Sequence, residues 1–582
     1  MRTFCLVLIT VLVLLLPEIP SAAERGARLR VQGLTGDPLA NVEAALQLPA
    51  ALATGGKETS LWLRRYLRKV PARVAAALEP FGYYRARTEV TVTRVANGRE
   101  IRVTVDPGPP ARVSDLKLSV AGDIPAKLEP LVAEFGPKPG EVLDHRIYEK
   151  SKAALLAAAQ DLGYLAAAFT RHRIEVDPAG ETATIDAELT LGRHYRFGDI
   201  RVEGGDGYPD RFLRRFLTFR PGDPFSYDQL GRSQRQLLDS DRFSTVALLP
   251  QHGSARGGLV PVRVQLTPKK PRRLRPGIGY ATDTGARITL RYQDVNMLGL
   301  GHELNSDLLA AERRQDLGTA YLVPSYRSVD SLVALRGGYH RENLDTYETE
   351  LISAELEQIY RFSRKRVGSW FVRLQSERST ISGDKVRSGS LLPGLRYTQR
   401  LLDSDTRPRR GYSVTLETRG TIEGVLSDIS LMQIFGSANL LIPLPKEATL
   451  LLRSQFGTTV LKNPFDDVPA SLRFFAGGDH SVRGYAYQEL GPVDASGHTI
   501  GGKSLLTGSL ELEQGIAGNW GWALFYDAGN AFDDMTSFEL AQAAGLGLRW
   551  YSPAGPVRID LARTLGEEKA SYRLHLGLGV GW

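Results

Sequence analysis

The sequence predicts three small α+β domains followed by a 16-stranded antiparallel transmembrane β-barrel. Three observations support this fold class. Residues 28–268 repeat a pattern of helix, turn and strand about every 80 positions. After Pro271, helical periodicity gives way to strict alternation of apolar and polar residues. Downstream of residue 23, no apolar run approaches the roughly 18 residues that a membrane helix requires. An exported chain without such helices is either soluble or a β-barrel.

Residues 1–23 are typical of a secretory signal peptide. Arg2 supplies the positive charge, Phe4–Leu16 is a short apolar segment, and small residues precede a cleavage point after Ala23. An uncleaved membrane anchor is the alternative interpretation. The only cysteine, Cys5, lies inside the apolar segment, so the predicted mature chain has no disulfide framework and no thiolate chemistry.

Residues 24–107, 108–191 and 192–269 are predicted to form the three α+β domains. Gly82 and Gly163 stand 81 residues apart in related turns, and Gly140 and Gly222 stand 82 apart. A period this long is too great for a solenoid and suits tandem domains, each with a small sheet covered by helices. The predicted helices are 63–78, 148–159 and 227–238, and the predicted strands are 99–108, 183–192 and 260–269.

Residues 270–582 are predicted to form the barrel. In the segment Ala286–Gln293, Ile288, Leu290 and Tyr292 alternate with polar residues, and about 16 such segments can be marked. A β-sandwich is the alternative. The polar face carries Arg, Glu and Gln, which a lumen tolerates and a sandwich core does not, and an even strand number is usual for an outer-membrane barrel. The barrel also leaves no unpaired edge in lipid.

A long segment, about 463–502, interrupts the strands and carries the motif Val482-Arg483-Gly484-Tyr485 within "FFAGGDHSVRGYAYQELGP". This motif, the following "GSLELE", "LFYDAGNAF" and "GLGLRWYSPAGPVRIDLA", and the terminal Trp582 resemble the outer-membrane protein insertases and two-partner secretion transporters. The resemblance covers the whole mature chain and implies periplasmic POTRA repeats, a loop folded into the lumen, and a C-terminal assembly signal at Trp582.

Three repeats and this length resemble the TamA family, which is related to BamA. The resemblance implies an outer-membrane factor that inserts or translocates autotransporters and other outer-membrane proteins. The implied partners are a TamB-like protein anchored in the inner membrane, unfolded client proteins and the lipid bilayer. The alternative is a two-partner-type pore that exports one soluble protein, although such transporters typically have two repeats and a plug helix.

The loop tip suggests a structural role for Arg483. If Leu510 and Leu512 face lipid, Glu511 and Glu513 turn inward, and Asp527 should face inward on the next strand. A guanidinium group suits bidentate pairing with carboxylates. We therefore expect Arg483 to pin the loop to Glu511 and Asp527, with Glu513 as a further candidate. A solvated arginine without a fixed partner is the alternative.

The first and last predicted strands are both poorly suited to pairing with each other. Proline removes a backbone donor, and glycine weakens strand order. These residues suit a weak lateral seam and sheet curvature equally well, and the resemblance favours a seam that opens sideways. The residues are Pro276, Gly277, Gly279, Gly577, Gly579 and Gly581.

No enzyme, cofactor, metal or nucleic-acid function is predicted. The net charge of +8 is spread along the chain, and no basic stripe is interleaved with aromatic residues. The nine histidines are scattered, with no metal-binding pair in a helical context. Residues Gly497–Ser504, "GHTIGGKS", match a phosphate-binding loop, but the sequence after Ser504 predicts a strand where such a loop needs a helix. No nucleotide is therefore expected.

Overall fold

The computed structural model describes residues 27–53, 59–95, 98–281, 284–404, 407–552, 555–567 and 570–578. The predicted signal peptide, Gly579, Gly581 and Trp582 lie outside these residues. Parts of the third domain, Arg201–Thr218 and Gly231–Leu249, form one compact unit with the chain from Arg263 onward. Among the described helices, none is both long and apolar enough to cross a membrane.

The first domain packs helices against a three-stranded sheet of order β1-β3-β2. In α4, Tyr66, Val70 and Val74 recur every four residues and form one apolar face, which shares a buried core with Ile101 and Val103 of β3. The elements are β1 (Ala27–Gln32), α2 (Gly36–Ala45), α3 (Ala50–Ala53), α4 (Thr59–Leu78), η2 (Glu79–Phe81), β2 (Arg87–Val95) and β3 (Gly98–Asp106).

The second domain repeats this arrangement, with sheet order β4-β6-β5. Its long helix begins after Asp144, whose carboxylate accepts the backbone N–H of Arg146 as an N-cap. Leu155 and Ala159 of that helix share the buried core with Ile185 and Ala187. The elements are β4 (Arg112–Ala121), α5 (Glu129–Ala133), α6 (His145–Asp161), β5 (Ala168–Asp177) and β6 (Thr182–Thr190).

The third domain has sheet order β7-β9-β8. Its elements are β7 (Arg196–Glu203), α7 (Asp210–Arg214), α8 (Tyr227–Asp239), β8 (Phe243–Pro250), η3 (His252–Ser254) and β9 (Leu259–Pro268). The predicted helices lie within α4, α6 and α8, and the predicted strands coincide with β3, β6 and β9 to within two residues.

The repeated glycines mark a turn that needs a left-handed backbone. Gly82 and Gly163 have φ of 85° and 91°. A Cβ at Gly82 would lie 2.6 Å from the carbonyl oxygen of Leu143, and one at Gly163 would lie 2.8 Å from that of Tyr195. Only glycine combines this φ with such close backbone approach, which accounts for the repeat signal in the sequence.

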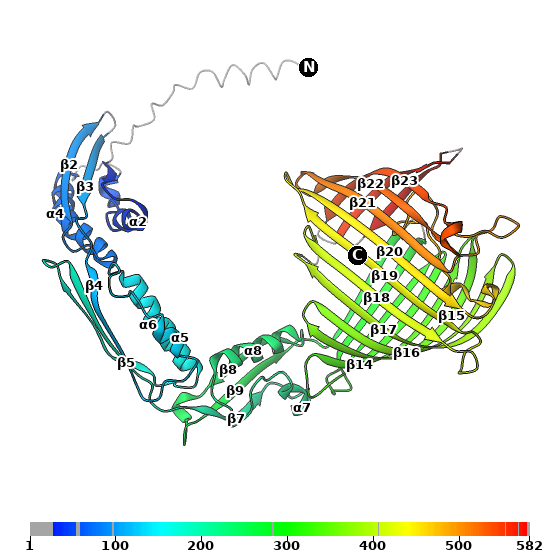
Figure 1. Cartoon of the computed structure of the whole chain (residues 1–582), viewed down its shortest axis with the longest axis horizontal. Coiled ribbons are helices and arrows are strands. Elements are labelled where there is room, and N and C mark those ends of the chain that lie inside the picture. Colours follow the sequence, from blue (N-terminus) through cyan, green and yellow to red (C-terminus); the bar gives the residue numbers. More distant parts are fainter. Residues whose placement is uncertain are drawn as a thin grey trace, which may run out of the picture. The chain divides into compact units, whose positions relative to one another are not determined.

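Sixteen antiparallel strands, β10 to β25, form one sheet in sequence order (Figure 1). The fold class predicted from the sequence is thereby confirmed. The strands are β10 (Arg272–Ala281), β11 (Gly285–Met297), β12 (His302–Ala311), β13 (Arg314–Pro324), β14 (Ser331–Asn343), β15 (Tyr347–Ser363), β16 (Arg366–Ile381), β17 (Asp384–Leu402), β18 (Gly411–Thr421), β19 (Leu431–Pro443), β20 (Ala448–Leu461), β21 (Ser504–Ala517), β22 (Trp520–Phe532), β23 (Ala541–Ser552), β24 (Gly555–Leu565) and β25 (Tyr572–Leu578); η6 (Met535–Ser537) lies between β22 and β23.

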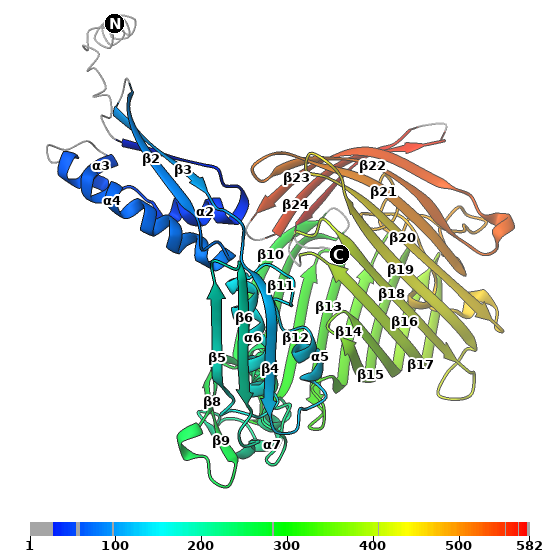
Figure 2. The same cartoon turned by 60° about the vertical axis from the view of Figure 1, so that its left-hand side comes forward.

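Alternation along each strand divides an apolar outside from a polar inside. On β21, Leu506 and Leu510 are 43% and 46% exposed, whereas Thr507 and Glu511 between and beside them are buried. The sheet curves round on itself (Figure 2). Buried carboxylates and arginines on one face of a sheet, with exposed leucines on the other, are the pattern of a membrane barrel with a polar lumen.

The segment between β20 and β21 folds back into that lumen. It contains η4 (Phe465–Asp467) and η5 (Ala470–Leu472), and Leu472 packs in a buried cluster with Leu392 and Leu431 of the barrel wall. Arg473 donates to the carbonyl oxygens of Val468 at 2.7 Å and Ile500 at 2.9 Å, so it ties the two legs of the loop together. The phosphate-loop match leads directly into β21, a strand.

Candidate functional site at the loop tip

The loop tip is buried against the C-terminal strands of the barrel. Val482 and Arg483 are 0% and 2% exposed. Gly484 has φ of 103°, and a Cβ there would lie 3.1 Å from the Cβ of Ala543. The chain can therefore turn at this point, against the wall of β23, only with glycine. This turn directs the Arg483 side chain toward the acidic faces of β21, β22 and β24.

The Arg483 guanidinium group lies among three carboxylates. Its Nε donates to Oδ2 of Asp527 at 2.7 Å, and Nη2 donates to Oδ1 of the same carboxylate at 2.9 Å. Its Nη1 donates to Glu511 at 2.8 Å and to Asp560 at 3.1 Å. The backbone N–H of Arg483 adds a bond of 3.0 Å to Asp527. The structure thus brings together the arginine and the two carboxylates named as its first partners.

An aromatic ring completes the arginine's surroundings. The guanidinium carbon lies 3.4 Å from the ring centroid of Phe525, which is 2% exposed. Nη2 also donates to the Ser509 hydroxyl at 3.3 Å. Stacking on the ring satisfies the face of the cation, while the carboxylates satisfy its edge, so the buried charge is compensated on both sides.

A second buried arginine, Arg549 of β23, shares this network. It donates to Glu511 at 2.5 Å and to Glu513 at 3.0 Å, and it also pairs with Asp560. The expectation that Glu513 pins the loop is therefore wrong, because Glu513 pairs with Arg549. Glu513 lies two residues further along β21 than Glu511, which is about 7 Å and too far from the loop tip.

Sequence reasoning missed Asp560, Arg549 and the ring of Phe525. The sequence did carry a signal for Asp560 and Arg549. Asp560 stands between Ile559 and Leu561, and Arg549 stands between Leu548 and Trp550; all four neighbours are exposed on the outer face. Alternation alone would have turned both charged side chains inward. Their contact with the loop network depends on the register between strands, which cannot be predicted from alternation.

The loop tip also contacts the last strand. The backbone N–H of Gly484 donates to Nε2 of His575 at 3.2 Å, and Nδ1 of His575 pairs with the carboxylate of Asp479. His575 is 3% exposed on β25. The tip is thus bonded to β21, β22, β24 and β25.

Four of the predicted seam residues lie in the first and last strands of the barrel. Pro276, Gly277 and Gly279 are in β10, and Gly577 is in β25. Gly579 and Gly581 lie outside the described residues. Over the portion of the two strands that the structure describes, no backbone ladder joins β25 to β10.

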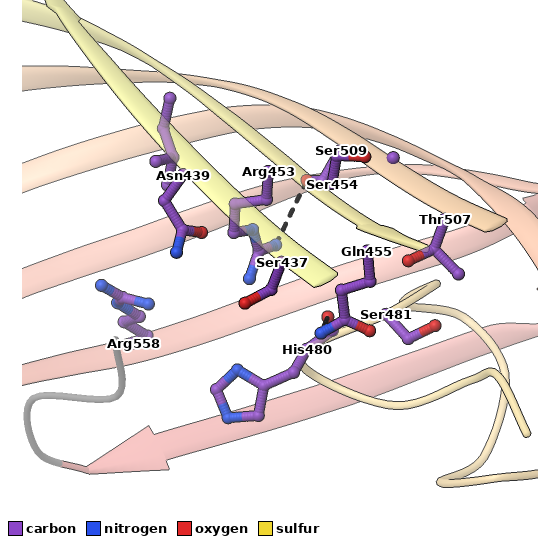
Figure 3. Close-up of a pocket in the computed structure, with 12 residues that line it drawn as sticks. Ser437, Asn439, Arg453, Ser454, Gln455, His480, Ser481, Thr507, Ser509 and Arg558 are labelled. Atoms are coloured by element: carbon purple, nitrogen blue, oxygen red, sulfur yellow. Dashed lines mark hydrogen bonds between the residues drawn. The ribbon is translucent and has the colours of Figure 1, made fainter. Parts of the chain in front are cut away.

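A polar cavity of about 310 Å³ lies beside the tip inside the barrel (Figure 3). Arg453 of β20, Arg558 of β24 and His480 of the loop line it, together with serine and threonine hydroxyl groups. Arg453 donates to Ser509 at 3.2 Å and lies 4.0 Å from Glu511. The described lining of the cavity thus contains two arginines and no carboxylate, and Glu511 of the neighbouring network lies close to one of them, Arg453.

Comparison with protein families agrees with this geometry. The Omp85 superfamily domain matches residues 296–582, which include the loop, the network and the last strand. This chain is a BamA-related member of the Omp85 superfamily. The model for the first POTRA domain of TamA matches residues 28–107, and a POTRA model described as a surface antigen variable number repeat matches residues 195–267.

Two curated relatives are outer membrane protein assembly factors named BamA. The protein from Nitratidesulfovibrio vulgaris is 25% identical over 452 residues, covering 72% of this chain and 55% of its own. The protein from Neisseria meningitidis serogroup B is 24% identical over 587 residues, covering 86% of this chain and 71% of its own. This chain thus spans little more than half of the first relative.

The same fold occurs in a solved structure. The crystal structure of BamA from Haemophilus ducreyi lacking POTRA domains 1–3 matches with a TM-score of 0.68 at 18% identity, covering 80% of this chain and 98% of that one. This Omp85 protein is located in the outer membrane, with its POTRA domains in the periplasm. Because β10 follows the POTRA domains, the turns after β11, β13 and β15 are periplasmic, and the loop after β20 starts from the opposite rim.

Proposed function

We propose that this Omp85 protein is an assembly factor of the TamA type, which inserts or translocates autotransporters and other outer-membrane proteins. Its POTRA domains receive unfolded clients, and the seam between β10 and β25 opens sideways into the bilayer. A TamB-like protein anchored in the inner membrane is its proposed partner. In this proposal insertion needs no enzymatic reaction, because the folding of the client strand supplies the free energy.

The observation that carries this proposal is that β10 and β25 lie near each other without a backbone ladder over the residues that the structure describes. Within the described residues, the sheet begins at β10 and ends at β25 without a closing ladder. An open edge presents backbone donors and acceptors to an incoming strand, which is the basis of β-augmentation.

The first domain supports the TamA type, and the TamB-like partner is proposed only as a consequence of that type. Residues 28–107 match the model of the first TamA POTRA domain, and three α+β domains precede the barrel. The two BamA relatives support assembly of outer-membrane proteins as the general activity.

A disulfide across the seam tests the mechanism. Cysteines at Gly277 or Gly279, each combined with one at Gly577, would identify a pair that cross-links β10 to β25. The matched control joins β10 to β11 through Ile278→Cys and Ile288→Cys, which are register partners and both exposed on the outer face. The predicted mature chain contains no other cysteine. The assay is insertion of a labelled autotransporter barrel into vesicles that contain the protein.

We expect the oxidised seam pair to stop insertion, reduction to restore it, and the control pair to have no effect. Full insertion by the locked protein would refute a lateral opening. In cells, depletion separates the two functions: loss of several outer-membrane proteins supports assembly, whereas loss of a single secreted soluble protein would favour the two-partner pore.

A further inference from the structure

A groove of about 840 Å³ lies at the periplasmic rim of the barrel, within the compact unit that contains Arg201–Thr218, Gly231–Leu249 and the barrel strands. The POTRA side comes from α8 and the residues around it, such as Arg215 and Arg242. The barrel side comes from the ends of β12 to β15 and their turns, including Leu322, Leu332 and Arg361. No residue of the loop-tip network lines this groove.

The barrel side of the groove faces the lumen. Leu322, Leu332 and Arg361 each lie an odd number of residues from Leu317, Leu335 and Tyr360 on the same strands. Those three residues are 46%, 49% and 44% exposed on the outer face. Because side chains alternate between the faces of a strand, the groove-lining residues point into the barrel. The groove therefore belongs to the periplasmic mouth of the lumen and is turned away from the lipid.

Positive charge dominates the groove. Six arginines line it, against three carboxylates. Arg242 lies 3.5 Å from Glu303, and Arg364 pairs with Asp239. Within the described part of the chain, Arg235 and Arg361 form no salt bridge. The six arginines are Arg215, Arg232, Arg235, Arg242, Arg361 and Arg364, and the carboxylates are Asp239, Glu303 and Asp330.

Arg215 lies within this excess of positive charge. It packs on the ring of Phe216 at 5.1 Å and donates to the carbonyl oxygen of Ser328 at 3.2 Å, while its buried Nε has no hydrogen-bond partner among the described residues. Burial, together with the positive charges of Arg242 and Arg361, lowers the pKa of Arg215 to about 10. An anion in the groove would relieve the repulsion among these arginines.

We propose that this groove binds an acidic segment of a client polypeptide at the entrance to the lumen. Guanidinium groups match carboxylates in geometry. Phe216, Leu322, Val329 and Leu332 supply an apolar floor for side chains between the acidic ones. The lumen-facing position favours a polypeptide over a lipid headgroup. The identity of the ligand as a client rests on the proposed assembly function, but the binding itself does not.

The test uses the full chain in nanodiscs and a fluorescent ten-residue peptide of alternating glutamate and valine, with an amidated end. Fluorescence anisotropy gives its Kd at low and moderate salt. The variant is Arg235→Glu with Arg361→Glu. The matched control is Arg341→Glu with Arg387→Glu, two exposed arginines outside the groove. A peptide with glutamine in place of glutamate controls for charge.

We expect the groove variant to weaken binding of the acidic peptide at least tenfold, the control variant to leave it unchanged, and the glutamine peptide to bind at least tenfold more weakly. Equal binding by the groove variant, or by the glutamine peptide, would overturn the proposal. Displacement of the peptide by glycerol phosphate at lower concentration than by free glutamate would assign the groove to a lipid headgroup and also overturn it. If the peptide binds as expected while depletion leaves outer-membrane proteins intact, the groove is an acidic-peptide site and only the assembly function fails.

Discussion

Removing Arg483 should leave one buried carboxylate without a cation. Glu511 and Asp560 also contact Arg549, but among the described residues Asp527, which is 0% exposed, has its ion pair with Arg483 alone. Breaking a buried pair by deleting one partner costs about 3–5 kcal/mol, because the remaining charge stays buried. We expect Arg483→Ala to lower the free energy of unfolding of the barrel by that amount.

Two further substitutions test whether the uncompensated charge of Asp527 causes the loss of stability. Asn at position 527 is neutral, so Asp527→Asn in the Arg483→Ala background should recover about 1–3 kcal/mol, although it lacks the original bonds. Arg483→Lys keeps the charge and loses the bidentate contact, so we expect an intermediate cost of about 1.5–3 kcal/mol. The assay is urea unfolding of the protein in phospholipid vesicles, followed by tryptophan fluorescence. If the double variant is no more stable than Arg483→Ala, an uncompensated Asp527 is not the source of the loss.

Four other substitutions test individual features of the barrel and of the third POTRA domain. Gly484→Ala should cost about 1–3 kcal/mol through backbone strain at φ 103°, measured by the same unfolding assay. His575→Ala should raise amide hydrogen exchange in β25, whereas Leu574→Ala, on the exposed face, should not. Arg549→Met should destabilise the barrel but leave the loop as resistant to protease as in the parent protein, because the bonds from Arg483 to Asp527 remain. Hydrogen bonds from Arg273 and Lys269 lower the pKa of Asp241 to about 2. The ionised carboxylate therefore stabilises the fold above its ordinary pKa near 4, and this stabilisation is lost as the pH falls toward 2. Asp241→Asn should make the free energy of unfolding less dependent on pH between about 4 and 2.

Much of the fold was predictable because its signals are local. Helix periodicity, turn glycines and strand alternation each depend on a few neighbouring residues, so the helices of the POTRA domains and the inward face of β21 could be read directly. The contact between Arg483 and Asp527 was also within reach, since a glycine-rich tip and an inward carboxylate on a nearby strand limit the possible partners.

The remaining features of the site depend on strand register and on contacts between segments that are distant in the sequence. Whether Glu511 or Glu513 meets Arg483 is a matter of two residues along β21, and a bulge between Gly515 and Ala517 shifts the pairing of that strand. The arginine groove could not be anticipated, because it collects side chains from α8 and from four barrel strands that are separated by up to about 150 residues in sequence.

The distribution of the loop-tip bonds bears on how the proposed seam opens. The tip is bonded to β21, β22, β24 and β25, which all lie on the C-terminal side of the seam. Moving β25 would break the contacts of His575 with Gly484 and Asp479, whereas moving β10 would leave every one of these bonds intact. The first strand takes no part in these bonds, it carries Pro276 and two glycines, and within the described residues its only backbone ladder is with β11. We therefore expect β10 to be the strand that moves when a client enters, with the loop tip holding the last strand in place as the template edge.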